Sequence, residues 1–139
     1  MSAETPKPLL VGELNPYGVA PAYALYPLPI NAAGYRLQRI LGLGMRDYLR
    51  KFDRVNLCSR RWEMSVARAR ADRITAEQRQ SGRAVILLGF KVCRAFGVEY
   101  VPFSATCGLR VLPHPSGRCR VWNQPGAERR ARELLAEFL

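Results

Sequence analysis

The chain has 139 residues, 48% of them hydrophobic, which suits one folded domain with a buried core rather than a disordered chain. No apolar run approaches the roughly 20 residues of a membrane span. The opening residues, MSAETPKPLL, lack the basic and apolar regions of a signal peptide. We therefore expect one cytoplasmic, monomeric domain over residues 1–139, with a loose polar tail at residues 1–7 and no membrane association.

The chain carries 22 Lys and Arg against 11 Asp and Glu, a net charge of +11. Nearly all of these cations are arginines, whose planar guanidinium binds phosphate through paired hydrogen bonds. Such an excess favours a polyanionic partner, a nucleic acid or a nucleotide. A compositional bias toward arginine is the alternative explanation. A membrane surface is disfavoured because the charges do not gather on one amphipathic segment.

The first half of the chain predicts two strands separated by a loop and a helix. The apolar residues 8–13 are typical of a buried strand, and the proline- and tyrosine-rich residues 14–29 are expected to form a loop. Helical spacing over residues 33–52, interrupted at Gly42 and Gly44, is followed by a second strand at residues 53–58.

The second half continues the alternation of helices and strands. It predicts a long helix at 61–82, a strand at 84–89, a short helix at 90–97, a strand at 109–112 and a terminal helix at 126–139. This order predicts an α/β fold, a three-layer α/β/α sandwich around a central, mostly parallel four-stranded sheet.

Polar segments follow three of the predicted strands. They are GELNPYG at residues 12–18, NLCSR at 56–60 and HPSGRC at 114–119. Because ligands bind at the carboxyl ends of the strands in an open α/β sheet, we expect the three segments to converge on one site.

The only histidine of the chain, His114, lies between Pro113 and Pro115 and is followed by Ser116 and Gly117. Prolines fix their own φ and restrict the residue before them, so the backbone around His114 is predicted to be stiff. This pattern indicates a rigid loop that presents one titratable group after the last strand. A surface loop with an incidental histidine is the alternative.

The four cysteines give little support for a metal site. Cys58, Cys93, Cys107 and Cys119 include no pair with C-x-x-C spacing. We expect reduced, mostly buried thiols, with no metal and no cofactor.

Two motifs resemble those of the uracil-DNA glycosylase superfamily. The first is Gly12-Glu13-Leu14-Asn15-Pro16-Tyr17 after the first strand, and the second is His114-Pro115-Ser116-Gly117 after the last. The intervening RVNLC and VILLGFKVCRAFG also fit the family pattern, so the resemblance spans roughly residues 9–123. It implies a monofunctional DNA glycosylase that flips a uracil or another modified pyrimidine out of DNA and hydrolyses its N-glycosidic bond.

The resemblance also implies roles for residues that would act on the departing base. His114 would donate a hydrogen bond to the base oxygen that gains negative charge. Asn15 would orient the attacking water, and Glu13 is either the missing base or a strand-end charge that faces solvent or pairs an arginine.

Further residues would bind the base and the DNA. Tyr17 would pack against the base C5 position, Asn56 would read the base edge through its amide, and Tyr26, or Tyr23, would stack on the ring. Ser116 and the backbone near Gly117 would hold a phosphate, and Arg118 would fill the gap left by the flipped base. Local structural roles in loops and turns are the alternatives for Tyr17, Asn56 and Tyr26, and an ordinary phosphate contact is the alternative for Arg118.

Other basic and aromatic residues are expected to play no part in the site. Arg61, Arg68, Arg70 and Arg73 are expected to form a solvated helix face. Trp62 and Trp122 are expected to anchor the core.

The sequence leaves two other functions to consider beside the glycosylase. A non-catalytic DNA- or modified-base-binding module of the same fold is favoured by Asn15 in place of an aspartate and by one extra residue between Gly12 and Asn15. A nucleotide hydrolase is disfavoured, because no carboxylate cluster for magnesium follows any predicted strand.

Overall fold

The computed structural model describes residues 6–14 and 20–139, and its centre is a five-stranded sheet. The strands are β1 (Leu9–Gly12), β2 (Asp53–Asn56), β3 (Val85–Leu88), β4 (Ser104–Thr106) and β5 (Leu109–Leu112). Their order across the sheet is β2-β1-β3-β5-β4, and every neighbouring pair is parallel except β4 and β5. The four predicted strands are confirmed, but the expected number of strands was one too few.

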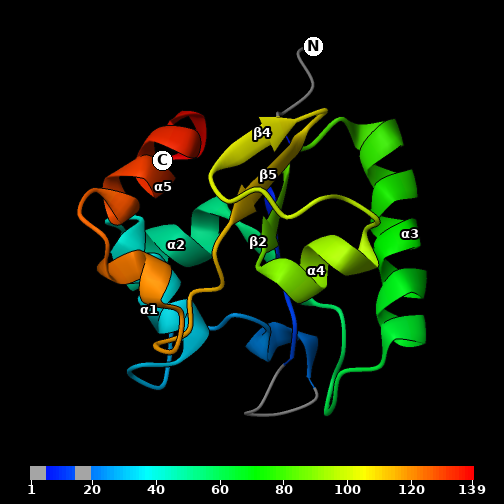
Figure 1. The fold of residues 1–139 in the computed structure, drawn as a ribbon, viewed down its shortest axis with the longest axis horizontal. Helices are drawn as coiled ribbons and strands as arrows, with labels where there is room; N and C mark the ends of the chain where they lie inside the picture. Colours follow the sequence, from blue (N-terminus) through cyan, green and yellow to red (C-terminus); the bar gives the residue numbers. More distant parts are fainter. Residues whose placement is uncertain (1–5, 15–19) are drawn as a thin grey trace.

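Helices cover both faces of the sheet, so the predicted three-layer α/β/α sandwich is confirmed (Figure 1). One outer layer contains α1 (Ala33–Ile40), α2 (Met45–Lys51) and α5 (Ala127–Leu134). The other contains α3 (Met64–Ser81) and α4 (Phe90–Ala95). Three short 3-10 turns complete the described structure, η1 (Pro21–Tyr23), η2 (Arg120–Asn123) and η3 (Ala136–Phe138).

Alternating side chains of the strands build two separate cores. Leu9 and Val11 of β1 pack with α3 and α4, whereas Leu10 between them packs with the helices on the opposite face. All residues of β1 and β3 are buried, as expected for central strands that are covered on both faces.

The helix boundaries follow local sequence signals. The predicted helix at 33–52 is divided where expected, because Gly42 adopts a left-handed φ of 71° and Gly44 precedes the first residue of α2. Helix α3 starts three residues later than predicted, at Met64, and ends before Gly82. The terminal helix ends at Leu134 and continues only as the turn η3.

Strand β4 escaped prediction because it is three residues long and contains Ser104, Ala105 and Thr106, which form no apolar run. It pairs with β5 through a turn in which Cys107 and Gly108 both have positive φ, the geometry of a tight hairpin. The hairpin adds an antiparallel strand at one edge of an otherwise parallel sheet.

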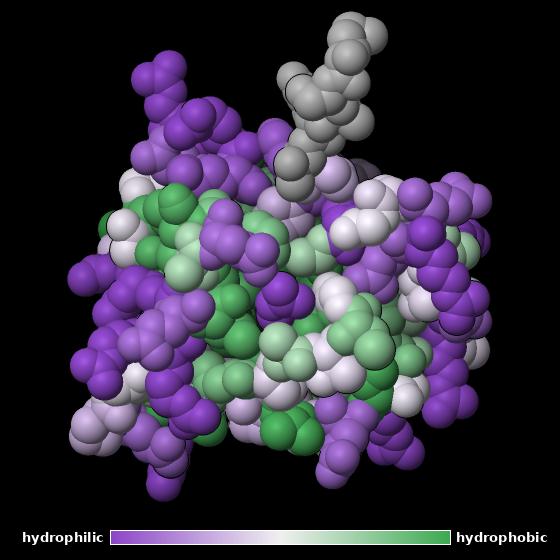
Figure 2. Space-filling model, turned by 90° about the horizontal axis from the view of Figure 1, so that it is seen from above, coloured by the Kyte–Doolittle hydropathy of each residue, from purple (hydrophilic) through white to green (hydrophobic). Residues whose placement is uncertain are grey.

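The carboxyl ends of the parallel strands all lie on the same side of the molecule, the lower side in Figure 1. Figure 2 looks onto the opposite side, where hydrophilic side chains project along the flanks and hydrophobic ones gather between them. Within residues 6–14 and 20–139, no helix combines the length and apolar character that a membrane crossing requires.

Candidate functional site

A cavity of about 330 Å3 lies at the carboxyl ends of β1, β2 and β5. Its lining includes six residues predicted for the site from the sequence, namely Glu13, Tyr26, Asn56, His114, Ser116 and Gly117. The convergence of the three polar segments is thus observed for these residues. Asn15 and Tyr17, also predicted for the site, lie outside the described residues.

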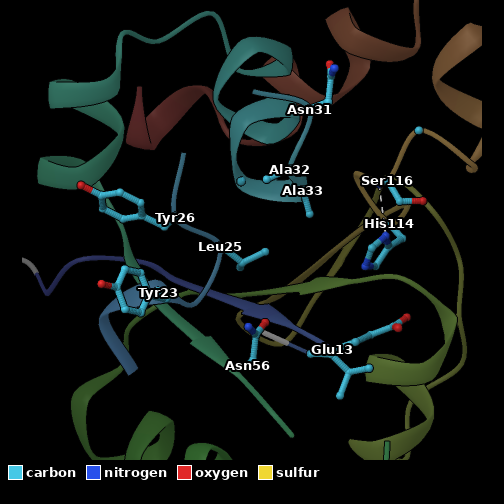
Figure 3. A pocket seen from close by; sticks show the side chains of 13 residues that line it. Glu13, Tyr23, Leu25, Tyr26, Asn31, Ala32, Ala33, Asn56, His114 and Ser116 are labelled. Carbon is cyan, nitrogen blue, oxygen red and sulfur yellow. Dashed lines mark hydrogen bonds between the residues drawn. The ribbon is translucent and has the colours of Figure 1, made fainter. Parts of the chain in front are cut away.

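The loop after β5 fixes both the position and the protonation of His114. The backbone N–H of Ser116 donates to Nδ1 of the imidazole at 3.1 Å, and the indole N–H of Trp122 donates to the backbone carbonyl of His114 at 2.9 Å. A ring nitrogen that accepts a hydrogen bond carries no proton, so the neutral ring is protonated at Nε2. Figure 3 shows that the ring nitrogen not bonded to Ser116 faces the cavity.

The surroundings of His114 favour its neutral form. Burial lowers the pKa of the imidazole below its usual value, the negative charge of Glu13 raises it, and the positive charge of Lys91 lowers it. Because burial dominates, the ring is neutral at physiological pH. The site therefore holds a neutral donor on Nε2 rather than an imidazolium cation.

Gly89, between β3 and α4, makes room for His114. A Cβ at this position would lie 3.1 Å from the Cβ of His114, and the backbone of Gly89 has a φ of 96°, which side chains rarely tolerate. The backbone N–H of Gly89 also donates to the carbonyl of Leu112 at 2.9 Å. The start of the His114 loop is thus fastened to the neighbouring strand end.

Asn56, the last residue of β2, presents an unpaired acceptor. The residue is only 6% exposed, and its Oδ1 is buried without a hydrogen-bond partner among the described residues. A Cβ on Gly12 would collide with this oxygen, so the glycine at the end of β1 is what admits the amide. Figure 3 shows the amide at the cavity wall. Its Oδ1 is buried beside Gly12 and Leu25, so a ligand reaches this oxygen only when the wall shifts.

Arg70 holds the end of β2 from behind. Its Nη1 donates to the backbone carbonyl of Asn56 at 3.2 Å, and the side chain is half-buried. The expectation of a solvated arginine face is therefore wrong for Arg70, whose guanidinium reaches back to the sheet. Arg61, Arg68 and Arg73 are exposed as expected, although Arg61 precedes α3 and pairs with Glu63 at 2.8 Å.

Glu13 follows β1 directly and is half-buried in the cavity wall. Its carboxylate extends toward the side of the cavity where His114 lies (Figure 3). No arginine or lysine of the described chain forms an ion pair with it. The sequence left open whether Glu13 is the missing base or a strand-end charge that faces solvent or pairs an arginine. Pairing with an arginine is not observed among the described residues.

An aromatic and apolar wall closes the side opposite His114. Tyr23 and Tyr26 meet edge to face with ring centroids 6.2 Å apart, and Leu25 lies between them in the chain. In Figure 3 the two tyrosine hydroxyls point away from the cavity, while the Leu25 side chain points toward it. Both tyrosines considered for stacking thus line the cavity.

Two side chains that no sequence pattern selected support this wall, the half-buried Arg54 and the buried Tyr48. Arg54 donates from Nη1 to the carbonyls of Ala22 and Ala24, at 3.1 and 2.9 Å, and its guanidinium lies 5.6 Å from the Tyr26 ring centroid. The Tyr48 hydroxyl donates to the carbonyl of Leu25 at 2.8 Å. Their partners are more than 20 residues away, so no local pattern reports these contacts.

The turn after His114 uses most of its own backbone donors. The N–H of Ser116 binds His114, the N–H of Arg118 binds Ser116 Oγ at 3.2 Å, and the N–H of Cys119 binds the carbonyl of Ser116 at 3.1 Å. Among the described residues, the N–H of Gly117 is left without a partner, and the Ser116 hydroxyl can still donate its hydrogen. Arg118 is exposed and does not line the cavity.

The remaining tryptophans and cysteines have structural surroundings. Trp62 and Trp122 are half-buried and pack against the two cores. Cys58 and Cys93 are buried, but Cys119 is half-buried and Cys107 is exposed, so only part of the expected burial is observed. Burial raises the pKa of the Cys93 thiol to about 11. The described residues contain no group of three His, Cys, Asp or Glu side chains arranged to hold a metal ion.

The cavity combines a neutral hydrogen-bond donor, a side-chain amide, one carboxylate and an apolar wall. Its volume falls in the range of small-molecule sites. Comparisons of the chain with protein-family models, curated proteins and solved structures find no match.

Proposed function

We propose that the protein is a DNA glycosylase that hydrolyses the N-glycosidic bond of uracil or another modified pyrimidine after the nucleotide is flipped into the cavity. The observation that carries this proposal is the pairing of a neutral hydrogen-bond donor with a side-chain amide in one cavity. The Nε2–H of His114 and the side-chain amide of Asn56 line the same cavity, which also contains a carboxylate.

The two groups match the hydrogen-bonding edge of a uracil-like ring. Such a ring presents an N3–H donor beside the O4 acceptor, and a carboxamide presents an acceptor beside a donor. When the glycosidic bond breaks, the electrons of the bond stay with the base, and negative charge develops on O2. A preorganised donor such as His114 stabilises that charge through a hydrogen bond, and its imidazole does not need to become a cation to do so.

The sugar that remains is cationic and needs only modest help from a nucleophile. In this proposal, water attacks the sugar carbon, and Glu13 takes the proton that the water loses. Asn15 orients the water through its amide, as the resemblance of the first motif implies. Tyr23 or Tyr26 stacks on the base.

The basic character of the chain supports DNA as the partner. The net charge of +11 provides many cations for phosphate contacts, which release counterions from DNA when they form. The Ser116 hydroxyl and the N–H of Gly117, at the cavity rim, are donors suited to a phosphate.

A non-catalytic reader of modified bases is the second candidate. It is favoured by the small number of acidic groups, since Glu13 is the only carboxylate among the described residues that line the cavity. Such a protein would bind the flipped base through the same Asn56 and His114 contacts and release it unchanged.

The first experiment incubates the purified protein with single- and double-stranded oligonucleotides that each carry one modified pyrimidine, then cleaves abasic sites with alkali. Strand cleavage at one or more modified positions, with none at unmodified thymine, is the expected result. DNA affinity is also expected to fall steeply with salt concentration. Salt-dependent binding without any base release would support the non-catalytic reader, and the absence of binding at low salt would refute both candidates.

A second experiment separates the two candidate water-handling residues. Glu13→Gln is expected to abolish base release nearly completely while DNA affinity persists, because the amide cannot accept a proton from water. Asn15→Ala is expected to weaken release strongly, and Asn15→Asp to keep or raise it. Single-turnover rates on the substrate found above measure each effect. Unchanged rates in both Glu13→Gln and Asn15→Ala would show that the first motif is not part of the site.

A further inference from the structure

A second hollow, of about 320 Å3, adjoins the candidate cavity. The two share Asn31, Ser116 and Gly117, which form a common ridge between them. On the far side of this ridge the wall is formed by Tyr35, Arg36, Arg39 and Ile40 of α1, and by residues near the start of α5. A chain that enters the first cavity at its rim can therefore continue into the second.

Two arginines give the second hollow its charge. The guanidinium of Arg36 lies directly against Gly117, since a Cβ on that glycine would be 2.7 Å from Nη2, and its Nε donates to the carbonyl of Asn31 at 3.3 Å. The guanidinium of Arg39 lies 5.8 Å from the ring centroid of Tyr35 and donates to its hydroxyl. Within residues 6–14 and 20–139, neither arginine forms an ion pair.

One carboxylate opposes them. Glu128, in the first turn of α5, also lines the hollow, and its oxygen lies 4.0 Å from Arg132. Two arginines against one glutamate leave the hollow with excess positive charge. An anion in the hollow would be attracted by both guanidiniums and repelled by Glu128. Removing an arginine should therefore weaken anion binding, and removing the glutamate charge should strengthen it.

We propose that this hollow binds the phosphate of the nucleotide next to the flipped one, with Arg36 and Arg39 as its donors. The proposal rests on the proposed function, because it places the target base in the adjoining cavity. A strand whose base enters that cavity must pass the ridge at Ser116 and Gly117. The next phosphate along it then reaches two guanidiniums that form no ion pair within the described residues, and each can bind phosphate oxygens through paired hydrogen bonds.

The test uses single-stranded oligonucleotides with a central 2′-fluoro-2′-deoxyuridine, whose electron-withdrawing fluorine disfavours the cationic sugar and slows cleavage. In each member of the series, one phosphate near the centre is replaced by an uncharged methylphosphonate. Fluorescence anisotropy measures affinity. For the parent protein, a methylphosphonate one nucleotide beyond the target is expected to weaken binding about tenfold, as loss of a charged hydrogen bond does.

Arg36→Gln is expected to weaken binding of the unmodified oligonucleotide by a similar factor, to lower the salt slope by about one unit, and to lose sensitivity to that methylphosphonate. Glu128→Gln is expected to strengthen binding. Arg68→Gln, which removes the same charge from the exposed side of α3, is the matched control and should retain the sensitivity. Arg39→Gln, at an exposed position, provides the same readout if Arg36→Gln does not fold.

Equal methylphosphonate losses in the parent and in both arginine variants would overturn the proposal, as would equal weakening by Arg36→Gln and Arg68→Gln. Base release from the modified-pyrimidine panel is scored separately. Loss of methylphosphonate sensitivity in Arg36→Gln without base release by the parent protein would leave the phosphate site standing and refute the glycosylase. Base release by the parent protein, with methylphosphonate sensitivity unchanged in Arg36→Gln, would support the glycosylase and refute the phosphate site. The absence of binding to any oligonucleotide would overturn both.

Discussion

His114 and Asn56 reach the same cavity, but their hydrogen-bonding states are opposite. The backbone carbonyl and Nδ1 of His114 are both bonded within the protein, which leaves one donor with a fixed direction. The Oδ1 of Asn56 is buried without a partner among the described residues. A fixed donor is ready before any ligand arrives, whereas an unpaired buried acceptor costs about 1–3 kcal/mol until a ligand satisfies it. In the glycosylase that we propose, the first serves the reaction and the second serves recognition of the base.

The largest expected effect comes from removing the fixed donor. In His114→Asn, the new amide oxygen can still accept the N–H of Ser116, but no donor reaches the cavity. Base release should slow by ~10²–10³-fold, the usual loss for one preorganised donor, and His114→Ala should match it. Single-turnover rates and anisotropy measure release and DNA affinity, and affinity should stay close to that of the parent. An unchanged rate in a folded variant would exclude His114 from the reaction.

A smaller effect is expected from removing the Asn56 amide, which should weaken binding of the base but stabilise the fold. Asn56→Leu should raise KM about 10–10²-fold, because the base loses two hydrogen bonds, and should increase the free energy of unfolding by about 1 kcal/mol, because no unpaired oxygen stays buried. Urea unfolding and steady-state kinetics measure the two. A variant that is less stable than the parent would indicate that the amide is satisfied in the free protein.

The smallest effect is a pH dependence that belongs to His114 alone. Burial lowers the pKa of its imidazole in the folded protein, so the unfolded chain binds this proton at higher pH than the folded one. The free energy of unfolding should therefore be highest above about pH 6.5, the ordinary histidine value, and should fall as the pH drops toward the folded-state pKa.

His114→Asn should lack this component of the pH dependence, which appears as the difference between parent and variant in urea unfolding across the pH range. Because the chain has 1 histidine, its imidazole resonance in NMR is unambiguous and reports the folded-state pKa directly. Titration at or above the ordinary histidine value would contradict the burial argument, and would imply that Glu13 outweighs both burial and Lys91.

Features with a local signal were predictable from the sequence, and those that depend on distant contacts were not. The apolar runs of β1 and β3 and the break at Gly42 are encoded within a few residues, as is the loop around His114. The support that Arg54 gives to the Tyr26 segment joins residues brought together only by the parallel pairing of β1 and β2. The second hollow depends likewise on α1 packing beside the loop after β5.

The candidate site divides in the same way. Residues at strand ends, such as Glu13, Asn56 and His114, were predictable, because the carboxyl ends of parallel strands share one edge. Leu25 and Gly34 also line the cavity, but they lie in the segment between β1 and α2. There a Cβ on Gly34 would collide with the carbonyl of Leu25, a close approach that a sequence pattern does not reveal.

The β4–β5 hairpin has a consequence for association between copies of the protein. A sheet that ended at β5 would expose the unpaired backbone of a strand in which Val111 and Leu112 are buried, and an exposed strand edge promotes aggregation. Strand β4 covers it with only three residues, preceded by Pro102 and Phe103, which leaves little length for further pairing. The opposite edge, β2, begins with Asp53 and Arg54, two charged residues that disfavour strand addition. The hairpin that escaped prediction thus leaves β5 with backbone partners on both sides, so that β5 is not an edge strand.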